Sequence, residues 1–424
     1  MKIVLTGAGF TNKGAEAMLL TVVTELAKRI PAVEFYLYRL RISERPQASA
    51  RGIPALYWPG DSTGGRLGLR WWSAKELGIK RIAKTLGAIQ DSERLLAIAY
   101  AEYLQRTVGR IDAVIDISGF AYGDNWGASR VRWSGPLLEC GLEHPMPIIY
   151  LPQAWGAFEE SDVRDATLKL LAIDGTAFFS RDAKSSEYLE ELLSCSSGSI
   201  RVCPDIVFAF DGGGRDAGEM VLAKMGCSRR RPIVGISPNM QIYRRTAGTG
   251  TENTYVQGIS GFVRRCLDRH DVDIVLQSNE IDAFGETADD RYLCGLIEES
   301  VDGSDRVLMT RDVLTAEQTA GLIGCFDYLI GSRFHSLVFA LSQGVACTAL
   351  GWSPKYSELL AAFGMKDAVL DAENVRPGVL DSCFDRGWDQ RDEARGRIAI
   401  VGRSMRESIG RLFDEVAVMV EGLG

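Results

Sequence analysis

Short apolar runs alternate with longer segments of helical spacing along most of the chain. The apolar run at 3–6 is followed by helical spacing at 15–29 and by a second apolar run at 33–38. The run at 232–237 starts the same alternation again. Short apolar runs predict buried strands, and their alternation with helices predicts a parallel sheet. The pattern therefore predicts an α/β protein with two Rossmann-like, doubly wound domains that face a central cleft.

The alternation is interrupted at 211–231, where glycine and charged residues are concentrated. We expect an N-terminal Rossmann-like domain at 1–210, a hinge at 211–231 and a C-terminal Rossmann-like domain at 232–390. Residues 391–424 have helical spacing, and we expect C-terminal helices that pack back on the N-terminal domain. A length of 424 residues agrees with two domains rather than one.

Composition argues against several classes of protein. With 46% hydrophobic and 25% charged residues, the chain can bury large cores and is not disordered. A net charge of −8 argues against non-specific binding of nucleic acid, which requires a basic surface. The nine cysteines include no CxxC pair, which indicates reduced thiols in a cytosolic protein.

Metal centres and membrane spans are not expected either. Only three histidines are present, His144, His270 and His335, so a three-histidine metal site is close to excluded. No apolar run approaches the roughly 20 residues that span a bilayer, and no signal peptide is evident. The basic and aromatic segment 60–85 is either an ordinary flap or a contact with a membrane surface. We expect a cytoplasmic protein, peripheral to the membrane at most, without a metal or cofactor.

The most informative stretch is 327–350, which predicts a strand, a tight turn, a helix and a second strand. Ser332, Arg333 and His335 lie where the first strand meets the helix. Ligands of α/β proteins bind at such edges, and a helix start beside a cation suits a phosphate or carboxylate. Residues two apart on a helix point about 200° away from each other. Arg333 and His335 can therefore share a ligand only if Arg333 belongs to the turn and the helix begins at about Phe334.

Each of these residues also has a purely structural interpretation. Arg333 can form a salt bridge to Asp327 or to another carboxylate, and His335 can bond to the backbone at the helix start. Lys355, near the start of the next predicted helix, is either a surface lysine or a ligand contact. The sequence leaves these alternatives open.

Loops after other predicted strands carry further polar side chains. Asn12 and Lys13 lie in a glycine-rich loop that does not fit the dinucleotide fingerprint, and this loop either lines the cleft or simply joins strand to helix. Asn239 follows the first strand of the second half. Asp116 lies inside a strand pattern and needs a partner if it is buried. Asp124 lies in a loop and is either a general acid or base, or a substrate contact, or a capping residue.

Several stretches together are similar to one known family. They are GFTNKGAEAML near the start, FFSRD and PDIVFAF in the middle, and most specifically DYLIGSRFHSLVFALSQGVACTALGWSPKYSELLAAFGM. On these stretches, and over nearly its whole length, the chain resembles the polysaccharide pyruvyl transferase family. The resemblance implies a GT-B-like fold, with the acceptor on the N-terminal domain and phosphoenolpyruvate on the C-terminal domain. The loop SGFAYGDNWG departs from the family, which often has a run of glycines there, so the acceptor can differ.

Enzymes of this family transfer the enolpyruvyl group of phosphoenolpyruvate to two hydroxyls of a sugar, which forms a ketal and releases phosphate. By resemblance, Arg333 and His335 are the donor-binding pair. Protonation of the vinyl carbon requires an acid with a pKa near neutrality, and His335 is the candidate. Asp124 is the candidate base, followed by Asp116. The full set of substrate-binding candidates is Arg333, Ser332, Asn12, Lys13, Asn239, Lys355 and Asp116.

The implied partners are phosphoenolpyruvate and a sugar, oligosaccharide or lipid-linked glycan acceptor, as in the biosynthesis of exopolysaccharide or another cell-surface glycan. Nucleic acid is not an expected partner, and an oligomer is compatible with the sequence. One alternative is a GT-B-type glycosyltransferase that uses a nucleotide sugar, with Asp289 or Asp290 on the ribose. Another is a non-catalytic binding protein with the same fold.

Overall fold

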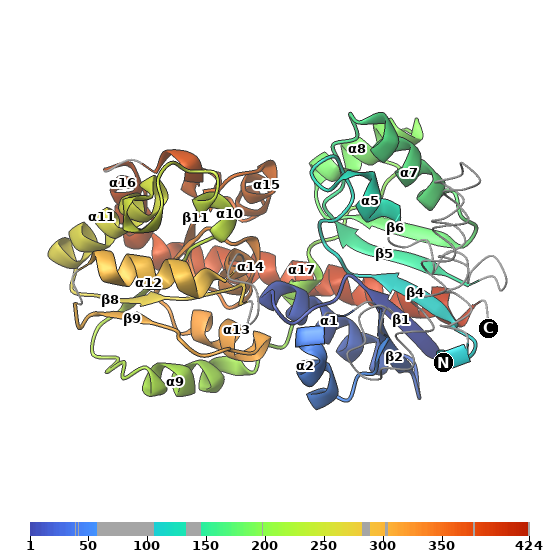
Figure 1. Cartoon of the computed structure of the whole chain (residues 1–424), viewed down its shortest axis with the longest axis horizontal. Helices are drawn as coiled ribbons and strands as arrows, with labels where there is room; N and C mark the ends of the chain where they lie inside the picture. Colours follow the sequence, from blue (N-terminus) through green and yellow to red (C-terminus); the bar gives the residue numbers. More distant parts are fainter. Residues whose placement is uncertain are drawn as a thin grey trace, which may run out of the picture. The chain divides into compact units, whose positions relative to one another are not determined.

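The computed structural model describes residues 1–38, 40, 42–56, 106–132, 146–196, 198–281, 289–301, 304–375 and 378–422. The segment 60–85, a flap or membrane contact by its sequence, lies outside the described residues. The chain groups into two compact units, each with its own sheet (Figure 1). The first unit is Met1–Gly9, Val22–Asp205 and Gly410–Gly424, and the second unit is Phe10–Thr21 and Ile206–Ile409.

The first unit contains a parallel sheet of order β3-β2-β1-β4-β5-β6. Its strands are β1 (Lys2–Thr6), β2 (Glu34–Tyr38), β3 (Ala55–Leu56), β4 (Ala113–Asp116), β5 (Ile148–Gln153) and β6 (Thr176–Ser180). The helices of this part of the chain are α1 (Lys13–Ala27), η1 (Ile42–Glu44), α2 (Arg45–Ala50), α5 (Gly127–Arg132), α7 (Ser161–Leu171) and α8 (Ala183–Leu193). The strands β4 and β5 are buried at every residue, as expected for parallel strands covered on both faces.

The second unit contains a parallel sheet of order β12-β11-β10-β7-β8-β9. Its strands are β7 (Ile233–Ser237), β8 (Asp273–Leu276), β9 (Val307–Met309), β10 (Tyr328–Gly331), β11 (Cys347–Gly351) and β12 (Val369–Asp371). The helices are η3 (Ile206–Ala209), α9 (Gly214–Lys224), α10 (Met240–Tyr243), η4 (Gly250–Glu252), α11 (Thr254–Arg269), α12 (Asp290–Ser300), α13 (Ala316–Gly324), α14 (Phe334–Ser342), α15 (Pro354–Ala362), η5 (Lys366–Ala368), η6 (Ala372–Asn374), α16 (Val379–Asp389) and α17 (Arg391–Glu421). The two parallel sheets with their helices confirm the predicted α/β fold.

The central strand β10 determines which loops meet at the carboxyl edge of the second sheet. Gly331, its last residue, is opposite Ser237 of β7 on one side and Ala349 of β11 on the other. The loops that follow β7, β10 and β11 therefore begin side by side. Carboxyl edges of this kind are where α/β proteins bind ligands.

The segment 211–231, which we expected to be a hinge, contains α9 and groups with the second unit. Two glycines explain why α9 packs closely on α13. A Cβ atom on Gly218 would lie only 2.1 Å from the carbonyl oxygen of Gly321, so a larger residue cannot replace glycine without a shift of the helices. The glycine in this segment therefore allows a close contact between two helices.

The C-terminal segment forms one long helix, α17. Its residues from Gly410 onward group with the first unit, where Arg29 donates to the Gly410 carbonyl at 3.1 Å and pairs with Asp414 at 2.7 Å. Among the described residues, no helix is both long enough and apolar enough to cross a membrane.

Candidate functional site

The turn between β10 and α14 meets the condition under which Arg333 and His335 can share a ligand. Gly331 ends β10, and α14 begins at Phe334. Arg333 is the N-cap residue, with extended backbone angles of φ −96° and ψ 129°. The prediction that Arg333 leaves the helix is therefore confirmed, and helical spacing does not separate Arg333 from His335.

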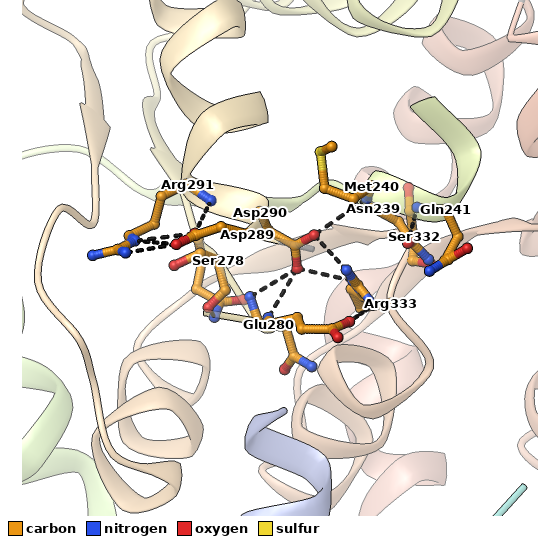
Figure 2. Close-up of polar contacts among 12 residues, drawn as sticks. Asn239, Met240, Gln241, Ser278, Glu280, Asp289, Asp290, Arg291, Ser332 and Arg333 are labelled. Carbon is orange, nitrogen blue, oxygen red and sulfur yellow. Dashed lines mark hydrogen bonds and ion pairs between the residues drawn. The ribbon is translucent and has the colours of Figure 1, made fainter. Parts of the chain in front are cut away.

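The guanidinium of Arg333 is occupied by two carboxylates (Figure 2). Its Nε donates to Asp290 Oδ2 at 2.8 Å, and its Nη2 donates to Asp290 Oδ1 at 2.5 Å. Its Nη1 pairs with Glu280. Asp327, the partner suggested by its position in the sequence, instead accepts the backbone N–H of Ile233 at 2.8 Å. The structure thus shows the salt-bridge alternative for Arg333, with Asp290 and Glu280 as the carboxylates.

Asp290 joins three loops at the carboxyl edge of the second sheet. Besides Arg333, its carboxylate accepts the backbone N–H groups of Met240 at 3.2 Å and Glu280 at 2.9 Å (Figure 2). Asp290 is fully buried, and burial raises its pKa to about 6, although Arg333 acts to lower it. Burial alone would lower the pKa of Arg333, but Asp290 and Glu280 raise it above its ordinary value. At neutral pH the pair is therefore ionised, and the charge of Arg333 is balanced within the protein.

Ser332 and Asn239 are brought together next to this pair. The Asn239 side-chain amide and the Tyr356 hydroxyl both donate to the Ser332 carbonyl at 2.9 Å, and the Tyr255 hydroxyl donates to Ser332 Oγ at 2.6 Å. Asn239 also caps α10 by accepting the N–H of Gln241 at 2.8 Å. Both side chains are buried and hold the loops in place.

His335 packs against the glycine-rich loop near the start of the chain. That loop pairs with the strand-end segment after β8, because the Lys13 N–H donates to Asn279 O at 3.0 Å and the Ile281 N–H donates to Thr11 O at 2.9 Å. A Cβ atom on Gly14 would lie 2.0 Å from Nδ1 of His335. Glycine is therefore needed at this position, because the imidazole lies directly over the backbone.

The side chains of Asn12 and Lys13 are used within their own loop. Asn12 Oδ1 accepts the N–H groups of Gly14 at 2.9 Å and Ala15 at 3.3 Å at the start of α1. Lys13 is 2% exposed, and its ammonium donates to the Phe10 carbonyl at 2.6 Å and to Glu16 at 2.9 Å. These contacts agree with the interpretation that the loop joins strand to helix. They also give the buried ammonium the partners that it needs.

Lys355 lies in an aromatic and cationic group on the same edge. Its ammonium is 5.0 Å from the ring centroid of Trp352 and 5.4 Å from that of Phe334. The guanidinium of Arg245 is 4.3 Å from the ring centroid of Trp352. We call Arg245, Trp352 and Lys355 the Trp352 cluster.

Asp116, in the first unit, is buried among neutral donors. It is 1% exposed and accepts the Tyr122 hydroxyl at 2.8 Å, the Gln153 amide at 2.6 Å and the Ser118 N–H at 2.9 Å. Burial raises the pKa of Asp116, and the hydrogen bonds from Ser118 and Tyr122, together with the charge of Arg130, oppose this rise. The partners that a buried Asp116 needs thus include Ser118, Tyr122 and Gln153.

Asp124 is partly exposed and caps the segment before α7. Its Oδ2 accepts the N–H of Glu159 at 2.8 Å and its Oδ1 accepts the N–H of Glu160 at 3.2 Å. The capping interpretation therefore describes its contacts in the structure, and a role as base stays a prediction.

Some residues that are neighbours in the sequence have their partners elsewhere in the chain. Arg181 and Asp182 are adjacent in the sequence but have separate partners: Arg181 pairs with Asp205 at 2.8 Å, and Asp182 caps α8. The role of Asp290 was also missed. Its signal is the doublet Asp289-Asp290, in which Asp289 caps α12 and Asp290 is left to point inward. Within the described part of the chain, no group of three His, Cys, Asp or Glu side chains is arranged to hold a metal ion.

Solved structures share this fold over nearly their whole length. A UDP-GlcNAc 2-epimerase from Neisseria meningitidis, bound to UDP-GlcNAc, matches with a TM-score of 0.58 and 11% identity over 98% of this chain and 99% of that chain. A glycosyltransferase from Rickettsia africae ESF-5 matches with a TM-score of 0.57 and 10% identity over 99% and 98%. Another UDP-N-acetylglucosamine 2-epimerase matches with a TM-score of 0.59 and 13% identity over 98% and 95%. At these identities the likeness shows the GT-B-like fold alone.

A protein-family model gives a more specific result. The model described as polysaccharide pyruvyl transferase matches residues 12–354. The matched region begins in the loop that packs on His335, and it includes the turn between β10 and α14 as well as Trp352. Because this match spans well over half of the chain, the protein belongs to the polysaccharide pyruvyl transferase family.

Proposed function

We propose that this protein transfers the enolpyruvyl group of phosphoenolpyruvate to two hydroxyls of a sugar in a glycan or glycan precursor. The product is a pyruvate ketal, and phosphate is released. The observation that carries the proposal is the position of His335 in the first turn of α14, at the carboxyl edge of the second sheet and inside the region that the family model matches. The Trp352 cluster supports it, because the donor is an anion and this edge carries two cations.

The reaction adds one proton to the vinyl carbon and removes one proton from each of the two sugar hydroxyls. His335, as an imidazolium, donates a proton to the vinyl carbon, which becomes a methyl group and leaves an oxocarbenium-like centre at C2. One sugar oxygen bonds to C2 and loses its proton, and the C2–O bond to phosphate breaks with its electron pair on the phosphate. The second sugar oxygen then bonds to C2 and loses its proton. One of these two protons restores the imidazolium, and the other leaves with phosphate.

Other residues have supporting roles in this proposal. Ser332 and Asn239 hold the turn that carries His335. Lys355 contacts the donor, and Asp124 is the candidate carboxylate that assists the attacking hydroxyl. The acceptor is a sugar, an oligosaccharide or a lipid-linked glycan.

The test is incubation of the purified protein with phosphoenolpyruvate and a panel of sugar acceptors, with release of phosphate and formation of the ketal both measured. His335→Gln should reduce phosphate release at least about 100-fold, since general acid catalysis contributes about 10²–10⁴. His270→Gln is the matched control, because His270 contacts Asp385 at 3.1 Å and has no role in the proposal.

Equal loss of activity in both histidine variants would point to general destabilisation rather than to acid catalysis. Binding of a nucleotide sugar, with no binding or turnover of phosphoenolpyruvate, would overturn the proposal in favour of a glycosyltransferase. In the structure, Asp289 pairs with Arg291 and Asp290 pairs with Arg333, so both carboxylates suggested for a ribose contact already have partners.

A further inference from the structure

The first unit contains a cavity of about 320 Å³ between the segment that follows β5 and the helices α7 and α8. Its wall includes Phe158 and Glu159 from that segment, Arg164 from α7, and Tyr188 and Glu191 from α8. Cavities that bind small molecules have volumes of about 300–1,000 Å³. The volume is therefore sufficient for a ligand with about one ring.

The loop that carries Asp124 holds one wall of this cavity in place. The Asp124 N–H donates to the Ala157 carbonyl at 3.0 Å, and the Gly156 N–H donates to the Tyr122 carbonyl at 3.0 Å. The Asp124 carboxylate accepts the N–H of Glu159 at 2.8 Å. Since Ala157 and Glu159 both line the cavity, the cavity adjoins the candidate base.

The lining of the cavity combines one guanidinium with two carboxylates. Nε and Nη2 of Arg164 donate to the Phe158 carbonyl at 3.1 Å and 2.9 Å, which fixes the guanidinium against the wall. Among the residues that the structure describes, Arg164, Glu159 and Glu191 form no ion pair. The carboxylates can accept O–H groups of a ligand, and Nη1 of Arg164 can donate to its oxygens.

Two aromatic rings give the same cavity an apolar part. Phe158 is buried, and Tyr188 is partly exposed. The Lys184 ammonium lies 4.7 Å from the ring centroid of Tyr188, but it pairs with Glu187 at 2.8 Å and does not line the cavity. Aromatic carbon beside a few hydrogen-bonding groups suits a sugar ring, which has C–H groups on its faces and hydroxyls around its edge.

We infer that this cavity binds one sugar unit of the acceptor glycan, and that this unit is neutral. Two carboxylates and one guanidinium give the lining one net negative charge, which disfavours a sugar that carries a carboxylate or a phosphate. A neutral sugar has hydroxyls that donate to Glu159 and Glu191 and accept from Arg164. The inference rests on the proposed function and adds the chemical class of the acceptor to it.

The test measures binding of the methyl glycosides of glucose, galactose, mannose and N-acetylglucosamine to the purified protein, with methyl glucuronide as the charged counterpart of methyl glucoside. At least one neutral glycoside should bind at millimolar concentrations, and methyl glucuronide should bind more weakly. Glu191→Ala should weaken binding of the neutral glycoside by about tenfold, as expected for the loss of one charge-assisted hydrogen bond. Glu191→Gln removes the net negative charge, so it should reduce the preference for the neutral glycoside over methyl glucuronide.

The matched control is Glu187→Ala, because Glu187 is an exposed glutamate of the same helix that pairs with Lys184 and does not line the cavity. It should leave the affinities within about twofold.

Three outcomes would overturn the inference: no binding of any neutral glycoside, tighter binding of methyl glucuronide than of every neutral glycoside, or equal affinities in Glu191→Ala and Glu187→Ala. Sugar binding is measured without phosphoenolpyruvate, so these outcomes would leave the proposed function standing. A protein that binds a neutral glycoside through Glu191, but forms no ketal from phosphoenolpyruvate on any acceptor, would overturn the proposed function and leave the cavity as a sugar site.

Discussion

Two buried aspartates, one in each unit, lie at the carboxyl edge of a parallel sheet and have different partners. Asp116 is the last residue of β4 and is surrounded by a hydroxyl, an amide and a backbone N–H. Asp290 is the first residue of α12 and forms a bidentate pair with Arg333. Burial raises the pKa of both carboxyls. The partner, rather than the burial, therefore distinguishes a neutral hydrogen-bond network from an ionic one.

The two networks should differ in how much stability is lost when one partner is removed. A neutral donor can be removed at the cost of one unsatisfied acceptor, which is about 1–3 kcal/mol. Removal of one member of a buried ion pair leaves a charge without compensation, which costs about 3–5 kcal/mol. The Asp290 network should therefore be the more sensitive of the two, and it is the one that supports His335.

The largest expected effect is that of Arg333→Met. This substitution keeps much of the side-chain volume but leaves Asp290 and Glu280 without their cation, so it should lower the unfolding free energy by about 3–5 kcal/mol. Urea unfolding at neutral pH measures the change. Arg291→Met is the control, since its pair with Asp289 is partly exposed and should contribute about 1 kcal/mol or less. Similar losses in the two variants would remove the contrast between buried and exposed pairs.

The second prediction concerns the pH dependence that Asp290 confers. Its folded-state pKa of about 6 lies above the ordinary value of 3.8, so between these pH values the folded protein keeps a proton that the unfolded chain has released. The stability from this proton is present below about pH 4 and is lost as the pH rises through 6. The unfolding free energy of the wild type, relative to Asp290→Asn, should therefore fall by up to about 3 kcal/mol from pH 4 to pH 7.

Urea unfolding of both proteins across this pH range tests the sign. A relative free energy that rises with pH would show that Arg333, and not burial, controls the pKa of Asp290. Asp116→Asn provides the comparison from the first unit, because burial raises the pKa of Asp116 in the same direction, while its hydrogen bonds come from neutral donors.

A smaller effect is expected from Tyr122→Phe. The substitution keeps the ring, which stacks on Trp155 at a centroid distance of 5.1 Å, and removes only the hydroxyl that donates to Asp116. It should lower the unfolding free energy by about 1–2 kcal/mol. Tyr36→Phe, which removes an exposed hydroxyl that contacts Glu34, should have no measurable effect. A loss above about 3 kcal/mol in Tyr122→Phe would mean that the neutral network is as sensitive as the ionic one.

The smallest effect on stability is expected from Asp124→Asn. Asparagine keeps one acceptor oxygen for the backbone N–H groups of Glu159 and Glu160, so the loss should be about 0.5 kcal/mol. Activity separates the two interpretations of Asp124. A base should lose at least about 100-fold in turnover of phosphoenolpyruvate, whereas a residue that only caps the loop should lose little. Thermal unfolding and phosphate release, measured on the same sample, distinguish the outcomes.

Much of the local structure follows from the sequence because it depends on short-range patterns. The apolar run at 327–330 predicts a buried strand, and β10 is buried at every residue. The start of α14 at Phe334 also follows, as does the capping box of Thr315 with Gln318 at the start of α13. These features depend on residues within one or two turns of each other, where period and capping chemistry are sufficient.

The candidate site depended on contacts between distant parts of the chain. Position in the sequence suggested Asp327 as a partner for Arg333, but the sheet order places β10 beside β7, with β8 next, and so brings Asp290 to it from 43 residues away. The grouping of Phe10–Thr21 with the second unit, which packs Gly14 on His335, is likewise a product of tertiary structure. Local sequence patterns predict the strands of the two sheets, the turn at Arg333 and the helix that carries His335. The carboxylates that neutralise Arg333 follow from tertiary structure, because the sheet order determines which strand-end loops become neighbours.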